Sequence, residues 1–390
     1  MENVGISEID IKPATQEKAV PEGNLVSNLD KFLYALRLVT HKSTIKGAEV
    51  QSERSLSMRA TRAQLFKEFQ STSKADKEGR KTILEEAHAR EEIAKQYLTQ
   101  GEVKVNIPGL GEQSARYTVI TPPEGRKTPD TDSKPPIFLI PGISNDIDCI
   151  GALAQEIPYK GRKVIVVGMP ESIMGKITPE FAKAVSETPG FGSHVDFYKG
   201  AINALVGENN QVELWGHSTG AVIIAEYLND PKNRERVENA VFLNPASSAN
   251  ISENALNLGI INELRNLLSR NLPKYMLSNR GEMEQKEMKA DLTKVMLKKV
   301  CTVDEAWRNA RVREGGKIVV YSGQKDNLTR SYEIFKGDKD SQDKVKQVNP
   351  QIEIIDDPKA YHSTVLIEPQ RVIRDVFTRQ ASSPKIPLSV

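Results

Sequence analysis

A regular alternation of short apolar runs with helical segments constrains the fold of this chain most strongly. The runs are IFLI (137–140), KVIVV (163–167), VELW (212–215), AVFL (240–243), KIVVY (317–321) and QIEII (351–355). They are apolar on both faces, as expected of strands that helices cover on both sides of a parallel sheet. The alternation therefore predicts an α/β protein with a doubly wound, mostly parallel sheet and right-handed crossovers.

Two further β-rich runs precede this region. VKVNI (103–107) and ARYTVIT (115–121) flank a Pro-Gly turn and predict an antiparallel hairpin that opens the sheet. Upstream of them, apolar residues recur at helical spacing from Ser27 onward. We therefore expect residues 1–100 to form an N-terminal helical extension, whose third helix lies within roughly 76–99.

The alternation of strands and helices is interrupted between the runs AVFL and KIVVY, where no strand signal occurs. Residues 256–268 carry one amphipathic helical pattern, and Val295, Met296, Leu297 and Val300 mark another. We expect a helical cap insertion over 246–312. The α/β core is then formed by residues 101–245 and 313–390.

Charge and composition exclude several classes of partner. The 390 residues hold 54 basic and 52 acidic side chains that are well mixed, so no nucleic-acid partner is expected. No stretch reaches the ~20 apolar residues that a membrane span needs. The N-terminus lacks the basic start and apolar run of a secretory signal, which predicts a cytoplasmic protein unless it is exported by a non-standard route. Neither metal-binding Cys/His spacing nor a nucleotide-binding glycine signature occurs, so no cofactor or metal is expected.

The segment Gly216-His217-Ser218-Thr219-Gly220 carries the clearest chemical signal. It directly follows the strand VELW and precedes the helical run AVIIAEYL. This strand, turn and helix is the context of a nucleophile elbow, which raises a serine hydroxyl above the sheet edge. The alternative is an ordinary glycine-rich turn. The context favours Ser218 as a nucleophile.

A serine hydroxyl needs a neighbouring base to act at neutral pH. Of the five histidines, only His362 follows Ser218, in a loop after the last strand. His194 precedes a helical segment, so we expect a structural role for it. Asp326 follows the strand KIVVY and is the candidate that orients His362. The competing position, after AVFL, offers Asn244 and no nearby carboxylate.

The motifs G-H-S-T-G, S-G-Q-K-D and A-Y-H-S make residues from about 103 to 380 resemble the α/β-hydrolase superfamily of serine esterases and lipases. The order Ser218, Asp326, His362 agrees with that of the superfamily. The resemblance implies an oxyanion hole made by the main-chain N–H groups of Ile143 and Thr219. Pro141 departs from the His-Gly pair that such proteins often have before the first donor.

The resemblance implies hydrolysis of a small or medium carboxylic ester through an acyl-enzyme. A lipase, thioesterase, amidase or acyltransferase would use the same triad, because one fold hosts all these activities. An alternative of another class is a non-catalytic scaffold that acts through its N-terminal helices. Residues 27–100 are then the expected surface for a protein partner or for self-association.

Overall fold

The computed structural model describes residues 97–127, 131, 133–143, 147–172, 175–246, 285–300 and 306–381. The helical extension expected upstream of Tyr97 lies outside the described residues, as does the amphipathic helix expected over 256–268.

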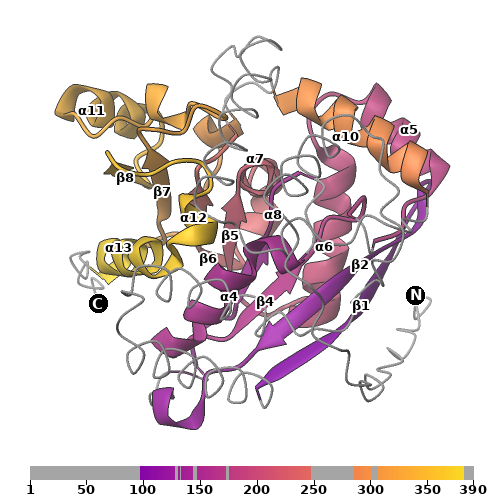
Figure 1. The fold of residues 1–390 in the computed structure, drawn as a ribbon, viewed down its shortest axis with the longest axis horizontal. Helices are drawn as coiled ribbons and strands as arrows, with labels where there is room; N and C mark the ends of the chain where they lie inside the picture. The colour runs from indigo at the N-terminus through magenta and orange to yellow at the C-terminus, as the bar shows by residue number, and fades with distance from the viewer. Residues whose placement is uncertain are drawn as a thin grey trace, which may run out of the picture.

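An eight-stranded sheet forms the centre of the molecule, in the order β1-β2-β4-β3-β5-β6-β7-β8 (Figure 1). The strands β3 to β8 are parallel to one another, whereas β2, near one edge, pairs antiparallel with both β1 and β4. This confirms the predicted mostly parallel sheet. The strands are β1 Leu98–Ile107, β2 Gly111–Ile120, β3 Ile137–Ile140, β4 Val164–Val167, β5 Val212–His217, β6 Val237–Leu243, β7 Ile318–Gly323 and β8 Ile352–Asp357.

The opening hairpin is longer than the sequence predicts. β1 begins at Leu98 rather than Val103, because Leu98 pairs with Ile120 and the ladder continues to Ile107 opposite Gly111. The helix expected within 76–99 is therefore wrong at its last residues. Pairing with a long neighbouring strand overrides the helical spacing of Tyr97 and Leu98, since strand preference depends on such cross-strand contacts.

Helices cover both faces of the sheet (Figure 1). Their bounds are α4 Gly151–Glu156, α5 Pro179–Glu187, α6 Gly192–Val206, α7 Thr219–Tyr227, α8 Pro231–Arg234, α10 Lys286–Val300, α11 Lys339–Val348, α12 Thr364–Ile367 and α13 Pro369–Ala381. Local signals start some of them: Thr178 caps α5 by accepting from the Phe181 N–H at 3.1 Å, and Pro179 occupies the first turn.

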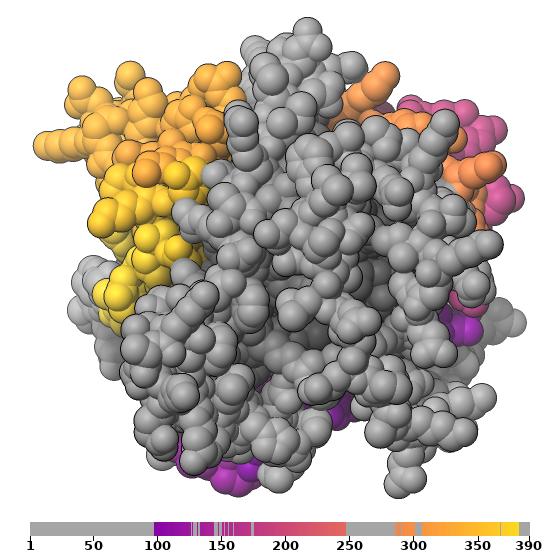
Figure 2. Space-filling view, viewed as in Figure 1, coloured from indigo at the N-terminus to yellow at the C-terminus, as the bar shows by residue number. Residues whose placement is uncertain are grey.

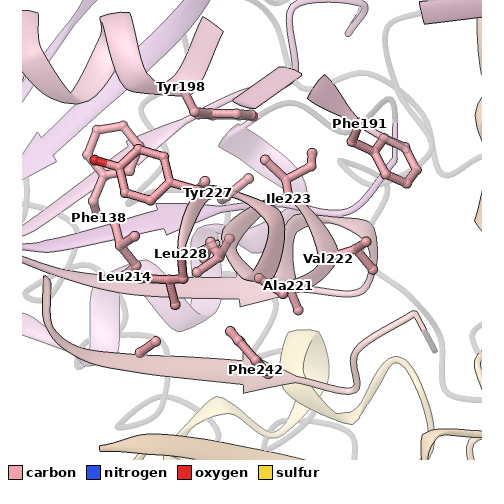
Figure 3. Packing of buried hydrophobic residues seen from close by; sticks show 14 of the residues in the cluster. Phe138, Phe191, Tyr198, Leu214, Ala221, Val222, Ile223, Tyr227, Leu228 and Phe242 are labelled. Atoms are coloured by element: carbon pink, nitrogen blue, oxygen red, sulfur yellow. The ribbon is translucent and has the colours of Figure 1, made fainter. Parts of the chain in front are cut away.

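Alternating residues of the strands contribute to two separate hydrophobic cores, one on each face of the sheet. Phe138 of β3 belongs to the core that includes residues of α6, α7 and α10, whereas the adjacent Leu139 belongs to the core on the opposite face, with residues of α4 and α13. Successive side chains of a strand point to opposite faces, so a run that is apolar throughout serves both cores. Figure 3 shows the first core, where Phe138, Leu214, Tyr198 and Ile223 gather from β3, β5, α6 and α7.

Helix α10 confirms the helix that the sequence predicts around Val295–Val300, and it packs against α5. Two lysines attach it. The buried Lys289 donates from Nζ to the carbonyls of Ser172 at 2.9 Å and Gly175 at 2.6 Å. Lys299 donates to the carbonyl of Gly190 at 2.9 Å. In the space-filling view, α5 and α10 lie on the opposite side of the molecule from α11 and α13 (Figure 2).

Candidate active site

Ser218 sits at a strained turn between β5 and α7. Its φ of 55° and ψ of −120° place a non-glycine residue in a sparsely populated region, at a typical cost of about 1–3 kcal/mol. The surrounding main chain fixes this conformation. The Ser218 N–H donates to the Leu243 carbonyl at 3.0 Å, and the Ser218 carbonyl accepts from Ala221 and Ala246, both at 3.1 Å. The turn therefore has the backbone strain and support expected of a nucleophile elbow.

The two glycines of the motif are required by close contacts. A Cβ on Gly216 would lie 2.5 Å from the Ala221 nitrogen, and one on Gly220 would lie 2.4 Å from the Ile140 carbonyl oxygen. A side chain at either position would push these segments apart. The contact at Gly220 also places the start of α7, with Thr219, against the loop after β3 that carries Ile143.

Asp326 is buried in the loop that follows β7, and its carboxylate is held by donors on both oxygens. Oδ1 accepts from the N–H groups of Leu328 at 2.9 Å and Thr329 at 3.0 Å. Oδ2 accepts from the Thr329 hydroxyl at 2.6 Å and lies 2.9 Å from Nδ1 of His362. The structure thus brings together the carboxylate and the imidazole that the sequence analysis selected.

The balance of effects on Asp326 favours its ionised form. Burial raises the pKa of its carboxyl group. The charge of His362 and the hydrogen bonds from His362 and Thr329 outweigh that effect and hold the pKa below its ordinary value. A carboxylate at this distance fixes the proton of His362 on Nδ1, which leaves Nε2 as the acceptor.

The loop of Asp326 and the loop of His362 are joined along their main chains. The Gln324 N–H donates to the Asp357 carbonyl and the Lys325 N–H to the Ala360 carbonyl, both at 2.9 Å. Gly323 is needed here, because a Cβ would lie 2.6 Å from the Ala360 oxygen. β5, β7 and β8 run parallel, so Ser218, Asp326 and His362, which follow them, lie at the same edge of the sheet.

His217 links Ser218 to His362. Its ring centre lies 4.8 Å from that of His362 at an interplanar angle of 39°, and its Nε2 lies 3.3 Å from the His362 carbonyl oxygen. Burial, followed by the nearby charge of His362, lowers the pKa of His217 to about 3. His217 is therefore uncharged at neutral pH.

Two residues at this site were not predicted from the sequence. His217 was named there only as part of the motif around Ser218, and Asn244 only as a position without a nearby carboxylate. The structure places both against the His362 main chain, with Asn244 Nδ2 3.1 Å from its carbonyl oxygen. The only sequence signal was that His217 ends a core strand and Asn244 directly follows another.

Within the described ranges, no group of three or more His, Cys, Asp or Glu side chains is placed to hold a metal ion. The same part of the chain contains no helix with the length and apolar character of a membrane span.

The arrangement of strands and helices is similar to that of several solved structures. A membrane phospholipase A described as a bacterial virulence factor is similar with a TM-score of 0.52 at 12% identity, over 78% of this chain and 93% of its own. The fold is that of the α/β-hydrolases. A Pseudomonas aeruginosa protein described as a probable hydrolytic enzyme gives a TM-score of 0.50 at 14% identity, over 72% of this chain and 93% of its own. The sequence matches no protein-family model and no curated protein.

Proposed function

We propose that this protein is a serine hydrolase that works by acyl transfer, with Ser218 as nucleophile, His362 as base and Asp326 as the residue that orients the base. One observation carries the proposal. A buried His362–Asp326 pair, 2.9 Å apart, lies beside the histidine that adjoins a serine held at a φ of 55°. A histidine oriented by a carboxylate beside a strained serine turn is the arrangement that serine activation requires.

The chemistry follows from the proton on Nδ1 of His362. Its free Nε2 takes the hydroxyl proton as the Ser218 oxygen attacks the ester carbonyl. The tetrahedral intermediate collapses as His362 returns that proton to the departing alcohol, which leaves an acyl-enzyme on Ser218. Water then attacks the acyl group with His362 again as base, and the carboxylic acid and free Ser218 are released.

The oxyanion of each intermediate would be bound by the main-chain N–H groups of Ile143 and Thr219. The tight contact of Gly220 with the loop after β3 supports this assignment, because it holds the start of α7 close to that loop. Each such donor contributes about 3–4 kcal/mol to transition-state stabilisation. Main-chain donors also explain how Pro141 can stand at the start of this loop.

A small or medium carboxylic ester is the proposed substrate. A lipase, thioesterase, amidase or acyltransferase would share every step up to the acyl-enzyme and would differ in the acyl group or its acceptor. A non-catalytic scaffold that acts through residues 27–100 would have no functional need for the backbone strain at Ser218.

We assign the acyl pocket to the cap insertion over 246–312. Exchanging that insertion should therefore change the preferred acyl-chain length, and an unchanged preference would contradict this assignment.

The test is covalent labelling by a fluorophosphonate probe, followed by hydrolysis of p-nitrophenyl esters of increasing chain length. We expect wild type to be labelled and Ser218→Ala not to be. Ser193→Ala removes a hydroxyl that is also buried but lies on α6, and it should label like wild type. Folded wild-type protein that neither labels nor cleaves any ester of the series would contradict the proposed function.

A further inference from the structure

The main-chain carbonyl of His362 accepts two side-chain hydrogen bonds from outside its own loop. Asn244, directly after β6, donates from Nδ2 at 3.1 Å. His217, the last residue of β5, lies with Nε2 at 3.3 Å. Both residues are buried, and a carbonyl oxygen has two lone pairs, so it can accept both bonds.

Asn244 also joins the two loops that carry the proposed acid and base. Its Oδ1 accepts from the Gly323 N–H at 2.9 Å, at the start of the Asp326 loop. Its Nδ2 donates to the Tyr361 carbonyl at 3.0 Å as well as to that of His362. One amide group therefore fixes the Asp326 loop to the His362 loop.

The backbone and the chemistry at this position both suit asparagine. Asn244 has a φ of 42°, in the left-handed region that asparagine tolerates better than most residues, and its N–H donates to the Tyr321 carbonyl at 2.8 Å. An aspartate would turn a second carboxylate oxygen toward two carbonyl oxygens. The amide instead supplies an acceptor for Gly323 and donors for Tyr361 and His362.

His217 can also hold the main chain of His362, through its neutral imidazole. Since it is uncharged at neutral pH, it has one N–H, and a bond to the His362 carbonyl places that hydrogen on Nε2. Its ring also packs against the imidazole that it helps to hold, with the ring centres 4.8 Å apart. The two contacts act on both the main chain and the side chain of His362.

We propose that Asn244 and His217 are positioning residues, which hold the main chain of His362 so that its imidazole stays aligned with both Asp326 and Ser218. The inference rests on the proposed hydrolase function. A displacement of about 1 Å at a reacting group can reduce a rate about 100-fold, so loss of either contact should lower kcat more than it changes KM.

Asn244→Asp is the primary test because it preserves shape and the Oδ1 acceptor while removing the donor. Asn349→Asp is its matched control: Asn349 is also buried and donates to the carbonyls of Trp307 at 2.9 Å and Ala310 at 2.7 Å, but it lies before β8, at the far end of that strand from His362. We expect Asn244→Asp to lower kcat about 10- to 100-fold with little change in KM. Asn349→Asp should lower the unfolding temperature and leave kcat unchanged.

A pair of His217 variants provides a second test if Asn244→Asp does not fold. His217→Phe keeps a ring against His362 but removes the donor, whereas His217→Gln keeps a donor for the carbonyl. Phenylalanine should lower kcat by about 10-fold or more, and glutamine should restore most of that loss. Equal effects of the two substitutions would contradict the proposed role of the hydrogen bond.

An NMR measurement separates this inference from the proposed function. The proton between His362 Nδ1 and Asp326, assigned with His362→Gln, reports the alignment of the pair whether or not the protein turns over an ester. We expect its resonance to broaden or disappear in Asn244→Asp and to persist in Asn349→Asp. The inference is overturned if both variants keep the resonance and the wild-type kcat, even though labelling of Ser218 stands. Loss of the resonance in Asn244→Asp, in a protein whose wild type is never labelled, would keep the positioning role and reject the hydrolase.

Discussion

Among the described residues, two buried histidine–carboxylate pairs have similar distances and different surroundings. His362 lies 2.9 Å from Asp326, and His194 lies 3.1 Å from Glu171. The first pair connects the loops after β7 and β8, and His362 is 6% exposed to solvent. The second connects α6 to the loop after β4, and its histidine is fully enclosed.

The surroundings of His194 are those of a packed interior. Its ring makes edge contacts with Phe181 and Phe191, with ring centres 5.2 Å and 5.9 Å apart. Its Nδ1 has no hydrogen-bond partner among the described residues. This agrees with the structural role expected from its sequence position. A buried histidine–carboxylate pair is thus not by itself evidence for an active site. The neighbouring strained serine and the position at the sheet edge distinguish the His362 pair.

The largest expected difference concerns catalysis. Asp326→Asn should lower kcat on the order of 10⁴-fold, because the wrong tautomer of His362 would be stabilised. Glu171→Gln makes the same chemical change in the other pair and should leave kcat unchanged. Steady-state hydrolysis of a p-nitrophenyl ester measures both. Comparable losses in the two variants would mean that the distinction between the pairs is wrong.

The second expected difference concerns stability. Glu171→Ala leaves the enclosed His194 imidazole without its partner and should lower the free energy of unfolding by about 1–3 kcal/mol. Glu180→Ala, at an exposed position in the first turn of α5, is the control and should change it little. Urea denaturation followed by circular dichroism gives both values. A Glu171→Ala protein as stable as the control would show that the second pair contributes nothing to stability.

The third prediction concerns pH and sharpens the description of the His362 pair. The pKa of His217 is about 3 in the folded protein and about 6.5 in the unfolded chain, so the unfolded state binds more protons between these values. The free energy of unfolding should therefore fall as the pH decreases from about 6.5 toward 3, by up to about 1.4 kcal/mol per pH unit from this group.

Asp326 contributes in a lower window, because its depressed pKa makes stability fall only once the pH drops below the ordinary value of 3.8. His217→Gln should flatten the dependence above pH 4 and leave that at lower pH in place. Denaturation midpoints measured between pH 3 and 7 test this. An identical slope above pH 4 in wild type and variant would contradict the assigned titration of His217.

The smallest effect is expected near the His194 pair, where Lys299 ties α10 to the turn before α6. Lys299→Met should lower the free energy of unfolding by about 1 kcal/mol, since it removes the bond to the Gly190 carbonyl. The exposed neighbour Lys298 supplies the control, Lys298→Met. A difference in unfolding midpoint between the two variants is the measurement. No difference would mean that α10 is held by its apolar contacts and Lys289.

Sequence reasoning predicted the local elements of this protein well. Every core strand expected from an apolar run is present, and the turn after VELW places Ser218 at a strained strand–helix junction. Asp326 and His362 could be selected because each follows a strand whose parallel neighbours end at the same edge. Strand periodicity and chain order are local properties, so the residues themselves carry this information.

Only the tertiary structure decided which distant residues meet. The length of β1 came from its ladder with β2, and the partner of His194 proved to be Glu171, in a loop that follows another strand. The contacts of Asn244 and His217 with the His362 carbonyl join segments more than a hundred positions apart. Such pairings depend on how strands are ordered in the sheet and how loops cross its edge. No spacing along the chain encodes them, because each joins residues that only the folded sheet brings together.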